Sequence, residues 1–168
     1  MNDKIPFYNI ANMFFVGCVF TLLLIIVIWD ILPIDSLKSY GDFLSNWMAI
    51  VSILFLTAMF EVGFIINRLG SIIIEPLYVK CKIWTREKYD VDVSEISQDN
   101  RKFQSMITEL NLMRSHIMMC VGLLIVSVCL CKWLYVLVLC CLIVVFSLGG
   151  RKHNEKINLI RKNYSLKK

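Results

Sequence analysis

The sequence predicts an all-α, polytopic membrane protein with about four transmembrane helices and a cytoplasmic helical segment between spans two and three. Apolar residues make up 58% of the 168 positions, and long apolar runs alternate with short polar ones. The mean hydropathy of +0.67 agrees with this pattern. A water-soluble domain of this length could not bury so much apolar surface around one core, so a bilayer must cover much of it.

The first apolar run, residues 10–32, has no charged residue before Asp30. At about 1.5 Å per residue it is long enough to cross a hydrocarbon core of about 30 Å. Only Lys4 carries a positive charge ahead of it, and no small-x-small cleavage site follows before Pro33. We therefore expect a retained first span rather than a cleaved signal peptide.

The second apolar run, residues 43–66, contains Glu61 as its only charged residue. Beyond it, Pro76 disfavours the helical conformation at Glu75. The sequence therefore predicts that this helix bends or ends just inside the cytoplasm.

A third apolar stretch, residues 117–148, is interrupted only by Lys132. As one helix it would be about 48 Å long and would overshoot the bilayer. Two short spans, residues 117–131 and 133–148, fit better and would turn near Lys132. One helix here, and three spans in all, is the alternative.

Lys and Arg residues are concentrated in the middle segment, residues 67–116, and in the basic tail, residues 149–168. The other two connections carry one lysine each, Lys38 and Lys132. The positive-inside rule therefore places the middle segment, the tail and both termini in the cytoplasm.

The middle segment contains a predicted amphipathic helix that continues into the third span, with Asp92 and Glu95 as a candidate cap at its start. Its apolar residues recur every three or four positions and form a cytoplasmic packing face. These residues are Phe103, Met106, Ile107, Leu110 and Met113. We expect this face to pack against the cytoplasmic extension of span two in the same chain, and a face shared between subunits is the alternative.

Span two and its extension carry a polar intramembrane stripe and a row of small residues. The stripe consists of Glu61, Asn67, Arg68 and Glu75, and the small residues that favour a close helix interface are Gly63 and Gly70. A charge at the bilayer centre costs about 2.5–3.5 kcal/mol, so Glu61 should face protein or water rather than lipid. Glu61 and Arg68 are about 10 Å apart along one helix, so each needs a partner on another span, on another subunit or in water. Arg68 and Glu75 as ordinary interfacial anchors are the alternative.

The seven cysteines do not predict a metal site. Most lie inside apolar runs without a nearby carboxylate or a zinc-like spacing, and we interpret them as small apolar filler. His116 is expected to be an interfacial residue and His153 a solvated one. No phosphate loop, zinc-protease motif or nucleophile elbow is present in the sequence, so we expect no catalytic residue, no cofactor and no enzyme activity.

Two stretches of the sequence carry a resemblance, "EVGFIINRLGSIIIEPL" and "ITELNLMRSHIMMCVGLLIV". They resemble a group of small bacterial multi-pass membrane proteins found beside anti-phage defence systems, which share G-x-x-x-x-R-x-G-S-x-x-x-E and E-x-N-x-x-R segments. The matching positions are Gly63, Arg68, Gly70, Ser71, Glu75, Glu109, Asn111 and Arg114. The resemblance implies an accessory membrane or pore protein of antiviral defence in the bacterial inner membrane.

Two classes of function follow from these patterns. One is an oligomeric membrane effector or channel-like accessory protein, and the alternative is a non-conducting membrane scaffold that recruits a cytoplasmic protein. The expected partners are the lipid bilayer, further copies of the chain and a cytoplasmic protein. Nucleic acid is not expected, because anionic lipid is the simpler partner for a basic tail beside a span.

Overall fold

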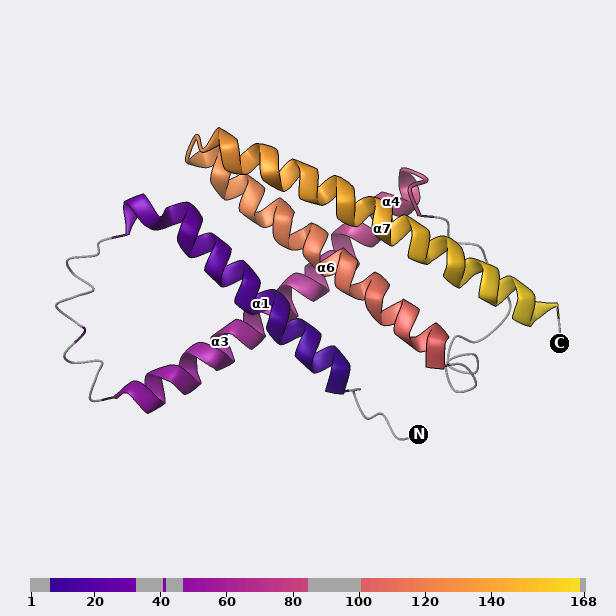
Figure 1. Ribbon diagram of the computed structural model, residues 1–168, viewed down its shortest axis with the longest axis horizontal. Coiled ribbons are helices and arrows are strands. Elements are labelled where there is room, and N and C mark those ends of the chain that lie inside the picture. Colours follow the sequence, from indigo (N-terminus) through magenta and orange to yellow (C-terminus); the bar gives the residue numbers. More distant parts are fainter. Residues whose placement is uncertain (1–6, 33–40, 42–46, 85–100, 167–168) are drawn as a thin grey trace.

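The computed structural model describes residues 7–32, 41, 47–84 and 101–166, and the described part of the chain is almost entirely helical, without strands. The four long helices are α1 (Phe7–Ile28), α3 (Met48–Leu69), α6 (Arg101–Cys129) and α7 (Trp133–Ser165) (Figure 1). Each belongs to a helical stretch that is long and apolar enough to cross a membrane. The predicted class, an all-α multi-pass membrane protein with four spanning helices, is confirmed.

Helices α6 and α7 form an antiparallel hairpin and lie side by side along most of their length (Figure 1). The chain reverses between Leu130 and Lys132, where Cys131 adopts a left-handed φ of 55°. The turn is therefore where the sequence predicts it. The two helices contain 29 and 33 residues, so both are longer than the predicted spans 117–131 and 133–148. Each helix simply continues through the adjoining polar segment.

Helix α1 crosses α3 at a contact between two glycines, Gly17 and Gly63. A Cβ atom added to Gly63 would lie 1.8 Å from the backbone oxygen of Met13, and one added to Gly17 would lie 1.8 Å from the backbone oxygen of Met59. The two helix backbones touch directly, as small residues allow in membrane proteins.

The helical stretch that starts with α3 continues past Pro76, where the sequence predicts that it bends or ends. It widens into a π-helical turn, η2 (Gly70–Ile74), in which the N–H of Glu75 bonds to the oxygen of Gly70, five residues back. The helix then continues as α4 (Glu75–Lys80). A proline ring ordinarily clashes with the carbonyl four residues before it, and the wider turn provides room for that ring. The prediction that Glu75 leaves the helical conformation is wrong for this reason, since its φ is −59° and its ψ −53°.

After α4 the chain folds back on itself. The backbone N–H of Trp84 bonds to the backbone oxygen of Tyr78, and the two rings pack at a tilt of 60° with their centroids 5.1 Å apart. Trp84 also covers Gly150 of α7, where an added Cβ would lie 2.9 Å from the indole. These contacts fix α4 against the middle of α7.

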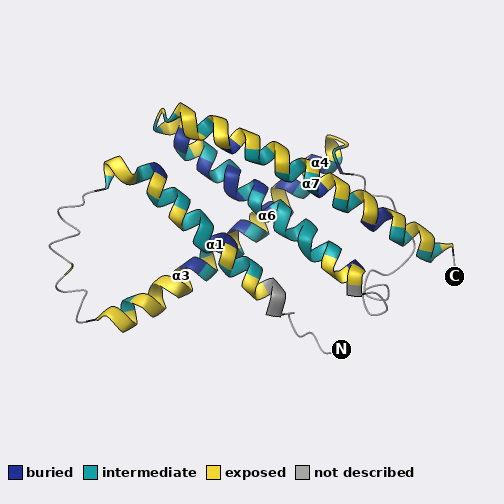
Figure 2. Cartoon of the chain, viewed as in Figure 1, coloured by how far each residue is buried: buried dark blue, intermediate teal, exposed yellow. Residues whose placement is uncertain are grey.

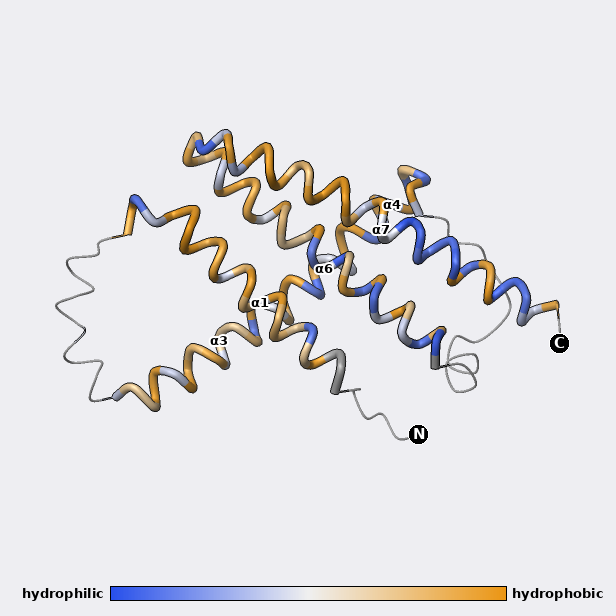
Figure 3. The backbone as a smooth tube through the Cα atoms, in the orientation of Figure 1, coloured by the Kyte–Doolittle hydropathy of each residue, from blue (hydrophilic) through white to orange (hydrophobic). Residues whose placement is uncertain are grey.

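The hydropathy of α7 changes along its length, with an apolar half from Trp133 and a polar half towards Ser165 (Figure 3). The predicted packing face on α6 lies against the polar half. Phe103 is fully buried in a cluster with Ile157 of α7, and the residues packed around them include Met106, Ile107 and Leu110.

The prediction that this face packs against the extension of span two is therefore wrong for most of its residues. Only Leu110 also belongs to the cluster formed by Ile74, Tyr78 and Trp84. Met113 lies beside Gly149 of α7. The cap predicted at Asp92 and Glu95 falls outside the described residues.

The opposite end of the molecule resembles a membrane–water boundary. Trp29, which lies in the short 3-10 helix η1 (Trp29–Ile31), Trp133 and Tyr135 are all exposed there. Lys132 bridges to Asp30 with 2.7 Å between Nζ and Oδ2 and joins the end of α1 to the α6–α7 turn. Amphipathic aromatic rings are enriched at such boundaries.

Candidate functional site

Four polar side chains meet where α3, η2 and α4 pack against α6. We call this cluster the polar junction and define it as Asn67, Glu75, Arg114 and Ser115. Its strongest contact is an ion pair between Arg114 Nη1 and Glu75 Oε2, 2.8 Å apart. The side chain of Arg114 is only 12% exposed and that of Glu75 is 34% exposed. A charge-assisted bond in such a partly buried place is stronger than a surface ion pair.

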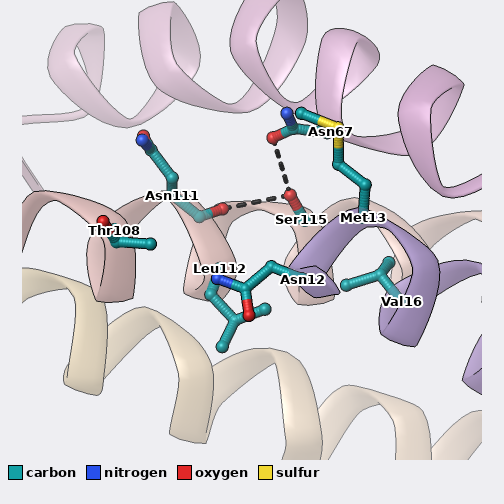
Figure 4. Close-up of a pocket in the computed structure, with 8 residues that line it drawn as sticks. All are labelled: Asn12, Met13, Val16, Asn67, Thr108, Asn111, Leu112 and Ser115. Carbon is teal, nitrogen blue, oxygen red and sulfur yellow. Dashed lines mark hydrogen bonds between the residues drawn. The ribbon is translucent and has the colours of Figure 1, made fainter. Parts of the chain in front are cut away.

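Asn67 and Ser115 complete the polar junction. Ser115 Oγ lies 2.9 Å from Asn67 Oδ1 and 3.0 Å from the backbone oxygen of Asn111, and its hydroxyl can donate to either acceptor (Figure 4). Arg114 Nη2 is a further 3.5 Å from Asn67 Oδ1. All four side chains therefore have partners within one chain.

The π-helical turn explains why Glu75 faces α6. A spacing of seven residues would place Glu75 on the same face as Glu61 and Arg68, but the π turn adds one residue to a helical turn and rotates everything after it by about 100°. The predicted continuous stripe is therefore broken after Arg68. Gly70 lets α6 approach, because an added Cβ there would lie 3.3 Å from Arg114 Cγ.

A polar cavity of about 70 Å³ adjoins the polar junction. Its polar side chains come from α1, α3 and α6, and Figure 4 labels all the lining residues. The polar ones are Asn12, Asn67, Thr108, Asn111 and Ser115. A space of this size holds about two water molecules, and amide and hydroxyl groups are suitable partners for them.

Glu61 and Arg68 lie outside the polar junction. Both are exposed on the surface of α3. The guanidinium of Arg68 lies over the ring of Phe64, 5.1 Å from its centroid, and Glu61 has no hydrogen bond or ion pair among the described residues. The structure thus brings Asn67 and Glu75 together with α6 and leaves Glu61 and Arg68 apart from them.

The small residues predicted for a helix interface both lie at contacts within one chain. Gly63 faces α1, and Gly70 faces Arg114 of α6. Their neighbours are therefore supplied without a second subunit.

Sequence reasoning did not assign Arg114, Asn111, Ser115 or Asn12 to a site. Arg114 and Asn111 could have been selected from the sequence, because both belong to the segments that carry the resemblance. Ser115 and Asn12 had a weaker signal, since Ser115 is a polar residue just before an apolar run and Asn12 is one inside such a run. Only the helix packing shows that these runs meet.

Both histidines lie in contacts between helices, and His153 is less exposed to solvent than expected. His153 Nδ1 lies 3.3 Å from Glu109 Oε2 and its side chain is 22% exposed, so the prediction of a solvated residue is wrong. His116 Nδ1 lies 2.8 Å from the backbone oxygen of Leu112, and its ring packs against Phe15 and Phe146. Both side chains are drawn into the contacts between helices.

Cys120 is the one cysteine that is fully buried among the described residues, and five others lie on the outer surface of the chain. These five are Cys81, Cys129, Cys131, Cys140 and Cys141. Within the described ranges no group of His, Cys, Asp and Glu residues is arranged to hold a metal ion.

Comparison of the chain with protein-family models, with curated proteins and with solved structures finds no match. The geometry of the helices and of their polar side chains therefore carries the functional argument.

Proposed function

We propose that the protein is an oligomeric, channel-like membrane effector whose subunits meet along the surface of α3 that carries Glu61 and Arg68. The observation behind this proposal is the exposure of Glu61 on a helical stretch long and apolar enough to cross a membrane. Glu61 lies about 20 Å along the helix from Met48, so a hydrocarbon core about 30 Å thick that begins near Met48 would contain it. Contact with lipid there would cost up to about 2.5–3.5 kcal/mol, and a second subunit or a water-filled path would remove that cost.

The polar junction differs from Glu61 in a way that supports the same proposal. Its side chains neutralise one another within the chain, whereas Glu61 does not find a partner among the described residues. The first half of α3 is also almost entirely exposed (Figure 2). The apolar part of this surface suits lipid as well as another copy of the chain, so the carboxylate is the feature that favours a contact between copies.

The resemblance to small bacterial membrane proteins found beside defence systems gives this proposal a biological setting. We propose that the effector acts in antiviral defence, in the bacterial inner membrane, with the lipid bilayer and other copies of the chain as its partners. The proposal requires no catalytic residue and no cofactor.

Ion flux through liposomes tests this function. We expect wild-type protein to make liposomes permeable, and we expect Glu61→Gln to change the flux at least severalfold while insertion is preserved, because the carboxylate is replaced by an isosteric amide. Ser52→Ala is the matched control, since Ser52 is also exposed on α3 and bonds only to the oxygen of Met48 one turn before it. Impermeable liposomes with both wild type and Glu61→Gln would instead favour a non-conducting scaffold.

The scaffold remains the second candidate because of the polar half of α7. Four basic residues are exposed there and could hold a cytoplasmic protein or an anionic lipid surface: Arg151, Lys152, Lys156 and Lys162. This surface and a pore are compatible in one molecule, so the flux measurement decides whether conduction is part of the function.

Cysteine labelling in intact cells tests the proposed orientation. In a background without native cysteines, we expect Lys132→Cys to react with an impermeant reagent from outside and Lys156→Cys to react only after the cells are opened, because Lys and Arg favour the cytoplasmic side. External labelling of Lys156→Cys would show that the orientation is reversed.

A further inference from the structure

A second cavity, of about 200 Å³, lies where α4, α6 and the polar half of α7 meet. Trp84 forms part of its wall, and Glu75 and Arg114 of the polar junction form another part. The cavity is about three times as large as the one described above, so it has room for a small organic group rather than for water alone.

Two residues that line this cavity carry a buried donor without an acceptor among the described residues. The donors are Nε1 of Trp84, whose residue is 3% exposed, and Nε of Arg114. Leaving a buried donor unsatisfied costs about 1–3 kcal/mol, which a bound acceptor would recover. The wall thus has a local excess of donors.

The charged groups in the lining indicate which kind of acceptor the cavity would bind. The lining contains two guanidinium groups, of Arg114 and Arg161, and one carboxylate, of Glu75, so its net charge is positive. Glu75 is already engaged by Arg114 Nη1. A phosphate group offers more acceptor oxygens than a carboxylate, and one of them would accept from Nε–H of Arg114, whose Nη1 is bonded to Glu75.

The rest of the lining combines three asparagines, Asn111, Asn154 and Asn158, with apolar side chains that suit the carbon part of such a ligand. Phe103, Ile107 and Ile157 are among the apolar ones, and Phe103 is fully buried. We propose that this cavity binds a phosphate ester, either the head group of a membrane lipid or a soluble small molecule. The two sources share the same recognition chemistry, and the proposal does not depend on whether the protein forms a channel.

The fluorescence of Trp84 provides a direct test on the full-length chain. The sequence has four tryptophans. The other three are exposed and do not line this cavity: Trp29, Trp47 and Trp133. Changing these three to Phe leaves Trp84 as the only reporter. The protein, in an uncharged detergent, is titrated with glycerol 3-phosphate, with phosphatidylglycerol, and with glycerol and diacylglycerol as ligands that lack the phosphate.

We expect a saturable change in Trp84 emission with a phosphate-bearing probe and none with its counterpart that lacks phosphate. Saturation by glycerol 3-phosphate would assign a soluble ligand, and saturation by phosphatidylglycerol alone would assign a lipid head group. If neither phosphate-bearing probe changes the emission, the proposal is wrong.

Two variants locate the binding. Glu75→Gln combined with Arg114→Gln removes the guanidinium without leaving an unpaired carboxylate, and should weaken binding at least about tenfold. Ile107→Phe fills the cavity from its apolar wall and should do the same with the ion pair intact, so it decides the question if the double variant does not fold. Lys132→Gln, which removes one positive charge at the opposite end of the molecule, is the matched control and should bind like the parent. Unchanged affinity in Ile107→Phe would contradict the assigned site.

Discussion

Replacing Gly63 by alanine should disrupt the crossing of α1 and α3 and destabilise the whole protein. A Cβ at this position would lie 1.8 Å from the backbone oxygen of Met13 and 3.0 Å from the backbone nitrogen of Gly17. A flexible side chain could move aside, but a helix backbone can yield only if the two helices separate. Overpacking commonly costs about 1–3 kcal/mol, and a clash with backbone atoms should cost about 3 kcal/mol or more.

Thermal unfolding of the purified protein in detergent measures this effect. Gly122→Ala is the matched control, because it adds the same methyl group to α6 and meets only the ring of Phe20, at an ordinary distance of 3.6 Å. We expect Gly63→Ala to melt well below wild type and Gly122→Ala to melt close to it. If Gly63→Ala instead weakened only the oligomer and left the melting of the monomer unchanged, Gly63 would belong to a subunit interface and the α1–α3 contact would be wrong.

Replacing Arg114 by glutamine should have the second largest effect. The change leaves Glu75 at a partly buried position without its counter-charge, and it removes the bond across the polar junction. Breaking a fully buried ion pair costs about 3–5 kcal/mol, but the side chain of Glu75 is 34% exposed, so a loss of about 2 kcal/mol is more appropriate.

The double variant separates the interaction free energy of the ion pair from the effect of replacing either residue alone. Adding Glu75→Gln to Arg114→Gln removes the unpaired carboxylate and should restore part of the stability, which a double-mutant cycle measures. Strictly additive losses would show that the two side chains do not interact and would contradict the polar junction.

The four spanning helices were predictable because hydropathy and length alone identify them. The turn at Lys132 was predictable for a related reason, since one helix through residues 117–148 would be too long for a bilayer. The packing face of α6 was predictable as a surface, because Phe103, Ile107 and Leu110 follow the helical period. Its partner was not, because the matching residues on α7 are scattered among charged ones and the tail resembles a solvated basic segment. Ile157, Ile160 and Tyr164 nevertheless recur at three- and four-residue spacing, and that periodicity was the available signal.

Only two of the four residues of the polar junction could be predicted from the sequence. Asn67 and Glu75 could be selected because polar groups beside a span are costly, but their partners lie across a long connection that no local rule bridges. The π-helical turn was not predictable either, because rules for proline describe the α-helix that it disrupts rather than the wider turn that accommodates it. As a result, the expected stripe of Glu61, Arg68 and Glu75 is divided between two surfaces.

The most direct test of the proposed oligomer is cross-linking at Glu61 in native membranes. A variant without native cysteines would carry either Glu61→Cys or, as a control, Ile125→Cys, because Ile125 is 58% exposed on a different helix, α6. A short thiol-bridging reagent is added before solubilisation, and the products are separated by mass. We expect covalent dimers with Glu61→Cys and monomers with Ile125→Cys. Monomers with both variants, or equal dimer yields from both, would contradict a subunit contact along α3.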